Sequence, residues 1–330
     1  MTRAALSLLL LAACSRPPAP ELRLAVGGAE QLVYLPTTLA AQLGHYRDEG
    51  LNVRIDSFAG GARSLQALLG GSADVVSGFY DHTIQMAAEG RRLRAFVTML
   101  RYPGFVLASP AIARIEDLRG AVVGVTAPGS STHFFLNHLL STRGLAPGDV
   151  SVTSIGGAAT AVVAVERGKV GAAVMTDPAF TLLQRRLPSV RLLADARTAA
   201  GVRSIFDSDT YPAAVLYSTH EWLDRHPDAA RRLARALCRT LEWIQRHSPA
   251  EIAARMPPTH RGDDPEIYTA ALAAALPMFS PDGRMPDGGP AAVRRVLAVS
   301  SEKVRSARID LDHTFTNDLV AAVADARPRR

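Results

Sequence analysis

Three consecutive hydroxyl side chains, Ser130, Ser131 and Thr132, are the residues best suited to hold a small ligand. They follow a Pro128-Gly129 turn, which itself follows an apolar run, 121–125, typical of a buried strand. The segment after them has the apolar spacing of a helix. A strand that enters a helix through small residues leaves backbone N–H groups beside hydroxyls, a setting suited to a carboxylate, sulfonate or phosphate. An ordinary helix N-cap without a ligand is the alternative that this turn alone leaves open.

Glycine turns of the same kind recur at Gly60-Gly61 and Gly156-Gly157, each behind an expected strand. Glycine lets a ligand approach the backbone closely, although it also simply relieves crowding. Three aromatic residues, Phe79, Tyr80 and Tyr102, also lie near strand ends. They are suited either to stacking on a planar ligand or to packing in the core. We therefore count these turns and rings as candidate ligand-binding positions.

Charged and remaining polar candidates complete the set. Arg101 follows an expected strand and is suited to pair with an anion, or else to lie solvated at the surface. Asp177 is expected either to cap a helix or to recognise a hydrogen-bond donor such as an amine. Tyr34, the last residue of the 27–34 segment that follows the first strand, is a further candidate ligand-binding residue. His82 and His133 also lie just after the turns that follow expected strands, but their spacing does not match a metal site. We therefore expect structural histidines and no metal or cofactor.

An alternation of strands and helices must position these residues. Strands are expected at 21–26, 52–58, 74–77, 93–100, 121–125, 150–155, 171–176, 190–194 and 211–218. Beyond them the pattern is helical, at 227–246, 264–275, 289–304 and 316–326. This order predicts an α/β fold with mainly parallel sheets, in which ligands bind beyond the carboxyl ends of strands. The residues to inspect there are 27–34, 60–61, 79–82 and 101–102.

The first twenty residues resemble a lipoprotein leader. Arg3 precedes an apolar run, 4–13, which is too short to span a bilayer and fits a signal segment. Leu11-Ala12-Ala13-Cys14 resembles the bacterial lipobox, so Cys14 is the expected lipidation site. Residues 15–21 would then be a tether. No later stretch is long and apolar enough to cross a membrane, so we expect a soluble body held at the extracytoplasmic or periplasmic face.

Composition limits the remaining classes. The 330 residues are 48% hydrophobic, enough for one large core or two smaller ones. The other cysteine, Cys238, lies in a helical apolar pattern, so no disulfide framework is expected. The formal charge of +6 comes from scattered arginines. The sequence has no basic stripe, so we expect no nucleic-acid partner.

Several short runs together resemble the periplasmic solute-binding proteins of ABC importers, in the group that takes nitrate, sulfonates, taurine and thiamine-pyrimidine precursors. Residues 43–53, LGHYRDEGLNV, resemble the family's "GyfkdEGLdV" run. Weaker matches follow in the family's order at 67–75, 116–125, 129–131 and 166–173. Gly171 departs from the pattern, because the family usually has aspartate there. The similarity spans about residues 22–220.

This resemblance implies the type II periplasmic-binding fold, two lobes joined by two crossing segments with the ligand in the cleft between them. We expect one lobe from 22–108 and 211–330, and a second from 109–210, with crossings near 105–109 and 211–217. The C-terminal helices should return to the first lobe. Closure around a ligand would be a hinge motion.

The resemblance implies capture of a small organic solute without catalysis and its delivery to an ABC permease with its ATPase. We expect a monomeric, membrane-anchored protein. The aromatic and hydroxyl candidates favour an aromatic or heteroaromatic acid or a pyrimidine, with a sulfonate as the next choice. Two other classes remain open at this point. One is a sensor that presents its ligand to a membrane receptor, and the other is an enzyme on the same fold, similar to a thiamine-pyrimidine synthase.

Overall fold

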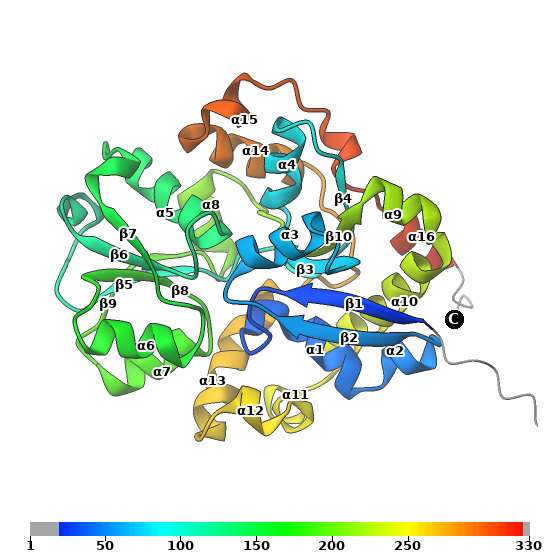
Figure 1. Cartoon of the computed structure of the whole chain (residues 1–330). Helices are drawn as coiled ribbons and strands as arrows, with labels where there is room; N and C mark the ends of the chain where they lie inside the picture. The colour runs from blue at the N-terminus through cyan, green and yellow to red at the C-terminus, as the bar shows by residue number, and fades with distance from the viewer. Residues whose placement is uncertain (1–19, 326–330) are drawn as a thin grey trace, which may run out of the picture.

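The computed structural model describes residues 20–325, which form two α/β lobes, each built on a mixed five-stranded sheet (Figure 1). Cys14 and the expected leader lie outside the described residues. The first sheet has the order β2-β1-β3-β10-β4, and the second has the order β7-β6-β8-β5-β9. We call the first sheet with its helices the first lobe, and the second sheet with α5 to α8 the second lobe.

The strands lie close to their expected positions. In the first sheet they are β1 (Glu21–Val26), β2 (Asn52–Ser57), β3 (Val75–Phe79), β4 (Leu93–Thr98) and β10 (Ala214–Thr219). In the second sheet they are β5 (Val106–Ser109), β6 (Val122–Val125), β7 (Ser151–Ser154), β8 (Ala172–Met175) and β9 (Arg191–Asp195). Three neighbouring strands in each sheet are parallel, while β10 in the first and β5 in the second run antiparallel to both of their neighbours.

The strand β5 corrects the expected division of the lobes. We expected the first crossing near 105–109 and a second lobe starting at 109, but β5 pairs with β8 and β9 inside the second sheet. The chain therefore crosses earlier, between the end of β4 and the start of β5. The return crossing lies between the end of α8 and the start of β10, so β10 belongs wholly to the first sheet.

Helices follow most strands, as expected. The longer ones of the two lobes are α1 (Leu35–Gln42), α3 (Gly61–Leu69), α4 (Asp81–Ala88), α5 (Ser131–Thr142), α6 (Ala159–Glu166), α7 (Ala179–Arg186) and α8 (Ala199–Phe206). The short helices η1 (Leu32–Tyr34) and α2 (His45–Asp48) flank α1. We did not expect α8, and Gly201, a residue that weakens a helical pattern, lies inside it. A Cβ at Gly201 would lie 1.8 Å from the backbone oxygen of Asp195, so only glycine fits this close helix–strand contact.

The C-terminal helices cover both lobes rather than the first alone. The longer ones are α10 (Pro227–Arg246), α11 (Pro249–Arg255), α13 (Pro265–Ala275), α14 (Gly289–Ser300) and α16 (Asp318–Asp325), and the shorter ones are α9 (His220–Arg225), α12 (Pro258–Arg261) and α15 (Glu302–Ser306). Helix α10 packs on α1, α2 and β4 of the first lobe. In contrast, α13 contacts α7, and α14 contacts both α4 and α5, so these two helices bridge the lobes.

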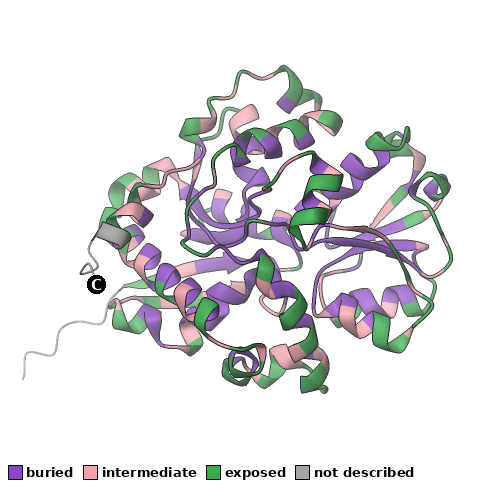
Figure 2. Ribbon diagram, turned by 180° about the vertical axis from the view of Figure 1, so that it is seen from behind, coloured by how far each residue is buried: buried purple, intermediate pink, exposed green. Residues whose placement is uncertain are grey.

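The core follows from strand alternation. In β5, Val106 and Ala108 face a cluster made with α6 and α7, whereas Leu107 faces the main core, which includes α5. Figure 1 shows α6 and α7 on one side of this sheet and α5 on the other. Figure 2 shows the central strands as buried and the exposed residues gathered on the outer faces of the helices. Both faces of each sheet are therefore covered, as expected of sheets with parallel strands.

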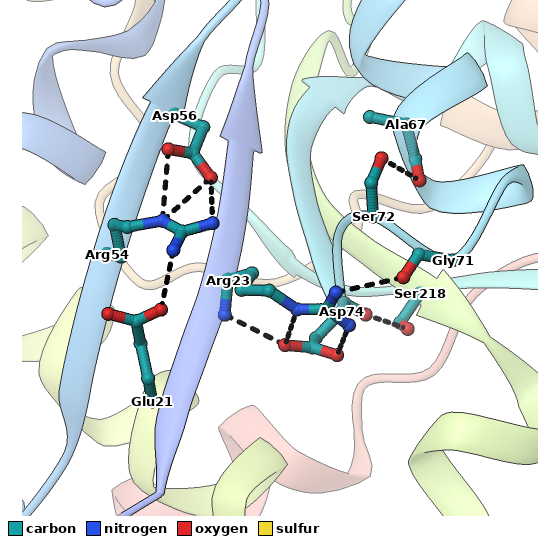
Figure 3. A network of polar contacts seen from close by, with 9 residues as sticks. All are labelled: Glu21, Arg23, Arg54, Asp56, Ala67, Gly71, Ser72, Asp74 and Ser218. Carbon is teal, nitrogen blue, oxygen red and sulfur yellow. Dashed lines mark hydrogen bonds and ion pairs between the residues drawn. The ribbon is translucent and has the colours of Figure 1, made fainter.

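Ion pairs tie together the strands of the first sheet (Figure 3). The guanidinium of Arg23 on β1 donates to both carboxylate oxygens of Asp74, at 2.7 and 3.1 Å, and to the backbone oxygen of Gly71. The hydroxyl of Ser218 donates to the backbone oxygen of Asp74. Burial would raise the pKa of Asp74, but hydrogen bonds from Arg23 outweigh it and hold that pKa below its usual value. Asp74, part of one motif that carries the resemblance, therefore joins β1, β3 and β10.

Candidate functional site

Residues at the carboxyl ends of β1, β3 and β6 meet at one cavity between the lobes. The cavity is lined by Gly27, Gln31, Val33, Tyr34, Gly61, Phe79, Phe105, Thr126, Ser130, Ser131 and Thr132. Its volume is about 10 Å³, the space of about one water molecule. A larger ligand would require the two lobes to separate. The position agrees with the rule that ligands bind beyond strand carboxyl ends in α/β sheets.

Ser130 joins the two helix starts that face each other across this cavity. It occupies the N-cap position of α5, but its side chain makes no capping bond to that helix. Its Oγ instead accepts a hydrogen bond, at 3.1 Å, from the backbone N–H of Ala62 in the first turn of α3. The N-cap of α3 is Gly60, which has no side chain and a positive φ of 95°. Ser130 therefore supplies from the second lobe the acceptor that Gly60 lacks.

Ser131 links the lobes through a buried acid. Its hydroxyl donates to Oδ1 of Asp81, at 2.8 Å, and Asp81 is the first residue of α4 in the first lobe. Asp81 is 2% exposed, and its burial raises the pKa of the carboxyl. The next residue, His82, is fully buried, and burial lowers the pKa of its imidazole. The third hydroxyl, that of Thr132, hydrogen-bonds with Thr126 inside the second lobe.

Tyrosines surround Asp81. Tyr34, Tyr211 and Tyr217 are buried, and burial is the main cause that raises the pKa of each phenol. The negative charge of Asp81 also raises all three pKa values, as the second cause for Tyr34 and Tyr211. For Tyr217 the neighbouring Tyr34 also contributes. The Tyr217 hydroxyl lies 3.4 Å from Nδ1 of His82, while Nε2 of that histidine is buried without a hydrogen-bond partner among the described residues. A buried acid with aromatic and imidazole neighbours therefore lies behind the first-lobe side of the cavity.

Phe79 and Phe105 form the aromatic part of the wall. Their rings are stacked, with centroids 4.9 Å apart and planes 10° apart. Tyr34 meets Phe79 edge-on at 6.0 Å, and Phe135 of α5 lies 5.6 Å from Phe105. A flat apolar surface of this kind suits contact with a planar ligand.

Gln31 crosses from the first lobe into the second. Its Nε2 donates to the backbone oxygen of Gly27, and its Oε1 accepts from the hydroxyl of Thr176 at 2.8 Å. A Cβ on Gly157 would lie 2.4 Å from Cδ of Gln31. The Gly156-Gly157 turn therefore leaves room for a side chain of the opposite lobe. Gly156 itself has a φ of 71°.

Asp177 contacts the second lobe's own residues and the first lobe's backbone. Its Oδ1 accepts from the backbone and hydroxyl of Thr181, as expected of a helix cap. Its Oδ2 accepts from Arg197 at 3.1 Å, and its backbone oxygen accepts from Leu32 of the first lobe. Helix α7 begins at Ala179 rather than at Pro178, because Pro178 occupies the N-cap position.

Other candidates lie outside this cavity. Arg101 is exposed, donates to the backbone oxygen of Pro277, and lies over the ring of Tyr102, which is itself buried. Tyr80 is fully buried and its hydroxyl meets that of Thr314, inside the first lobe. The Nδ1 of His133 accepts from the backbone of Gly129. The structure therefore brings together Tyr34, Gly61, Phe79 and the three hydroxyl residues, and places Arg101, Tyr80 and Tyr102 elsewhere.

Sequence reasoning did not select Gln31, Asp81, Phe105 or Thr126. Gln31 and Asp81 fall in the ranges behind the first and third strands, 27–34 and 79–82, that we marked for inspection. Their position after a strand could therefore have identified them as candidates. Phe105 lies in the segment that we took for a crossing.

The arrangement supplies groups that can bind a small molecule. It offers hydroxyls, one acid, one imidazole and stacked rings. Within residues 20–325, there is no group of three or more His, Cys, Asp or Glu side chains able to hold a metal ion. In the same range, no helix combines the length and the apolar character needed to cross a membrane.

Comparisons with known proteins give consistent similarities. The model of the family described as "NMT1/THI5 like" matches residues 31–252, more than half of the chain. A solved structure from Bordetella bronchiseptica RB50 is 36% identical, with a TM-score of 0.89, over 92% of this chain and 97% of that one.

Two more distant relatives have names that state a ligand. The riboflavin-binding protein RibY of Chloroflexus aurantiacus is 24% identical over 97% of both sequences. The alkanesulfonate-binding protein SsuA of Xanthomonas axonopodis pv. citri, bound to MOPS, is 19% identical, with a TM-score of 0.67, over 92% of this chain and 97% of that one. The last similarity shows a shared periplasmic-binding-protein fold.

Proposed function

Because the chain belongs to the NMT1/THI5-like family, we propose that it is the solute-binding component of an ABC importer, which captures a small organic solute between its lobes and delivers it to the permease. The observation that carries this proposal is that side chains of both lobes meet at the strand carboxyl ends. Ser130 with Ala62 and Ser131 with Asp81 are such contacts, and each must break when the lobes separate. A ligand that bridges the same surfaces would favour closure, and the closed form is what a permease would recognise.

The ligand we propose contains an aromatic or heteroaromatic ring. The stacked rings of Phe79 and Phe105 and the edge of Tyr34 support this choice. The named ligands of the relatives, riboflavin and an alkanesulfonate, include one ring system and one anion. We place ring-containing solutes, pyrimidines among them, ahead of alkyl sulfonates.

A thermal-shift screen tests the proposal. The protein beginning at residue 15 would be heated with sulfonates, nitrate, aromatic carboxylates, pyrimidines and amino acids. A ligand at about 100 times its dissociation constant adds about 2.7 kcal/mol to the free energy of unfolding. Native mass spectrometry of the purified protein would reveal a ligand carried from the host. If no compound raises the melting temperature and the purified protein has the mass of the ligand-free chain, the proposal is contradicted.

We further propose that the protein is anchored on the extracytoplasmic face through lipid on Cys14, as a monomer. The support is the Leu11-Ala12-Ala13-Cys14 sequence behind a short apolar run. Replacing Cys14 by serine should move the protein from the membrane fraction to the soluble fraction. A variant that stays with the membrane would contradict the anchor and leave the binding function untouched.

A further inference from the structure

The described lining of the cavity has no charged side chain, and one acid lies directly behind it. Among the described residues that line the cavity, none is a lysine or an arginine. The carboxylate of Asp81 lies directly behind Ser131, which does line it. The second acid at the interface, Asp177, already pairs with Arg197, whose guanidinium also pairs with Asp195.

The backbone donors expected to bind an anion have acceptors within the protein. The Ser130 hydroxyl accepts a hydrogen bond from the N–H of Ala62, and the Thr132 hydroxyl accepts one from the N–H of Thr126. The His133 ring accepts one from the N–H of Gly129. An anion at these turns would have to displace those side chains while lying near a carboxylate. Like charges at close range in a buried site disfavour each other. The two helix starts therefore make a poor anion site, despite their sequence.

Asp81, by contrast, has unused acceptor capacity. A carboxylate has room for about four hydrogen bonds, whereas Asp81 accepts from the Ser131 hydroxyl and the backbone of His82. No lysine or arginine of the described chain forms an ion pair with it. The groups that face it are His82 on its own helix, Tyr34, Tyr211 and Tyr217 on neighbouring segments, and Ser131 on α5. A buried charge so poorly compensated favours a donor or a cation.

Opening of the lobes would expose this acid to a ligand. The Ser131 hydroxyl belongs to the second lobe and Asp81 to the first, so their hydrogen bond is lost on separation and the carboxylate then faces the cleft. His82, the next residue of the same helix, supplies an imidazole whose Nδ1 lies 3.4 Å from the Tyr217 hydroxyl. Phe79 and Tyr34 flank the same wall.

We propose that Asp81 is the specificity-determining residue of the cleft and selects planar ligands that carry a cation or an N–H donor, such as amidines, aromatic amines or aminated heteroaromatic rings, over anions. This rests on the proposed function, since it names the ligand class of the same cleft. The donor of the ligand takes the place of Ser131 on the carboxylate, and the ring lies against the aromatic wall. Sulfonates, nitrate and aromatic carboxylates are disfavoured.

Benzamidine and benzoate are matched probes, because both are planar and of similar size but opposite charge. Their binding to the protein from residue 15 would be measured by calorimetry, together with the variants Asp81→Asn and Asp74→Asn. Asp74 is the control, because it is another acid of the first lobe, partly buried, but it pairs with Arg23 away from the cleft. We expect benzamidine to bind the wild-type protein at least about tenfold more tightly than benzoate, and Asp81→Asn to remove that preference while Asp74→Asn keeps it.

A pH series on the wild-type protein tests the same point without a variant. Benzamidine stays cationic, so its affinity should fall as acid protonates Asp81. Tighter binding of benzoate than of benzamidine would overturn the inference while supporting solute binding in general. Absence of benzamidine binding would also overturn it, and the wider thermal-shift panel would then judge the proposed function separately.

Discussion

The hydroxyl of Ser130 accepts a hydrogen bond from the backbone N–H of Ala62, although the two residues lie at the starts of helices in different lobes. Their separation along the chain is 68 positions. A capping contact that is normally local is thus made across the cleft, so helix α3 is fully capped only when the lobes meet.

Replacing Ser130 by alanine should weaken closure. Loss of an N-cap acceptor costs about 1 kcal/mol, so the ratio of closed to open protein should fall about fivefold. Spin labels on the exposed positions Arg63 and Arg143, one on each lobe, would report the distance distribution. Ser151→Ala, at an exposed site in the second lobe, is the control and should leave that distribution unchanged. An unchanged distribution in Ser130→Ala would contradict the role of this contact.

Gly157→Ala should also hinder closure, because the new methyl group would meet the Gln31 amide at 2.4 Å. Displacing that amide removes its hydrogen bond with Thr176, a loss of about 1 kcal/mol. The same interlobe distance measurement applies. Gly148→Ala is the matched control, since nothing lies within 4 Å of a Cβ there. Adding Gln31→Ala to Gly157→Ala should remove the clash, and strictly additive effects of the two changes would argue against direct contact.

Two acids should shape the pH dependence of stability in opposite directions. Burial raises the pKa of Asp81 in the folded protein above the value of about 3.9 in an unfolded chain. The folded state then binds more protons between those two pKa values, so the free energy of unfolding falls as the pH rises through that window. Asp81→Asn should therefore gain stability relative to the wild-type protein from acidic to neutral pH.

Asp74 has the opposite sign, because Arg23 holds its pKa below the unfolded value despite burial. Its contribution is complete above the unfolded pKa and is lost as the pH falls through the folded pKa. Asp74→Asn should thus be more destabilising at neutral pH than in acid. Urea unfolding across the pH range would measure both variants. Parallel curves for the two variants would refute the assignment.

Arg197→Met should destabilise the second lobe. The guanidinium is 15% exposed and pairs with Asp177, which is 3% exposed, and with Asp195. Burial alone would lower the pKa of Arg197, but its hydrogen bonds and the charges of these acids raise it. Removing the cation leaves a buried carboxylate without its partner, a cost of about 3 kcal/mol. Urea unfolding would measure it, with the exposed Arg167→Met as control; equal stability of both variants would contradict this account.

The sequence by itself determined the α/β alternation, the strands within a few residues, and several of the turns that meet at the cavity between the lobes. These features depend on local apolar periodicity and on glycine and proline at element ends, which act over a few residues. The same local signals were not sufficient for β5, a four-residue strand taken for a crossing, or for α8, where Gly201 is required by close packing against Asp195.

Only the tertiary structure decided the partners of the site residues. Ser131 meets Asp81 across 50 positions and Gln31 meets Thr176 across 145. Whether a hydroxyl is free for a ligand or already used depends on which distant atom lies within about 3 Å, and no local pattern encodes that distance. The burial of Asp81 likewise arises from several separate segments that pack around it. The turns suggested an anion site, but three backbone N–H groups at or facing them already donate to side chains that the fold brings there.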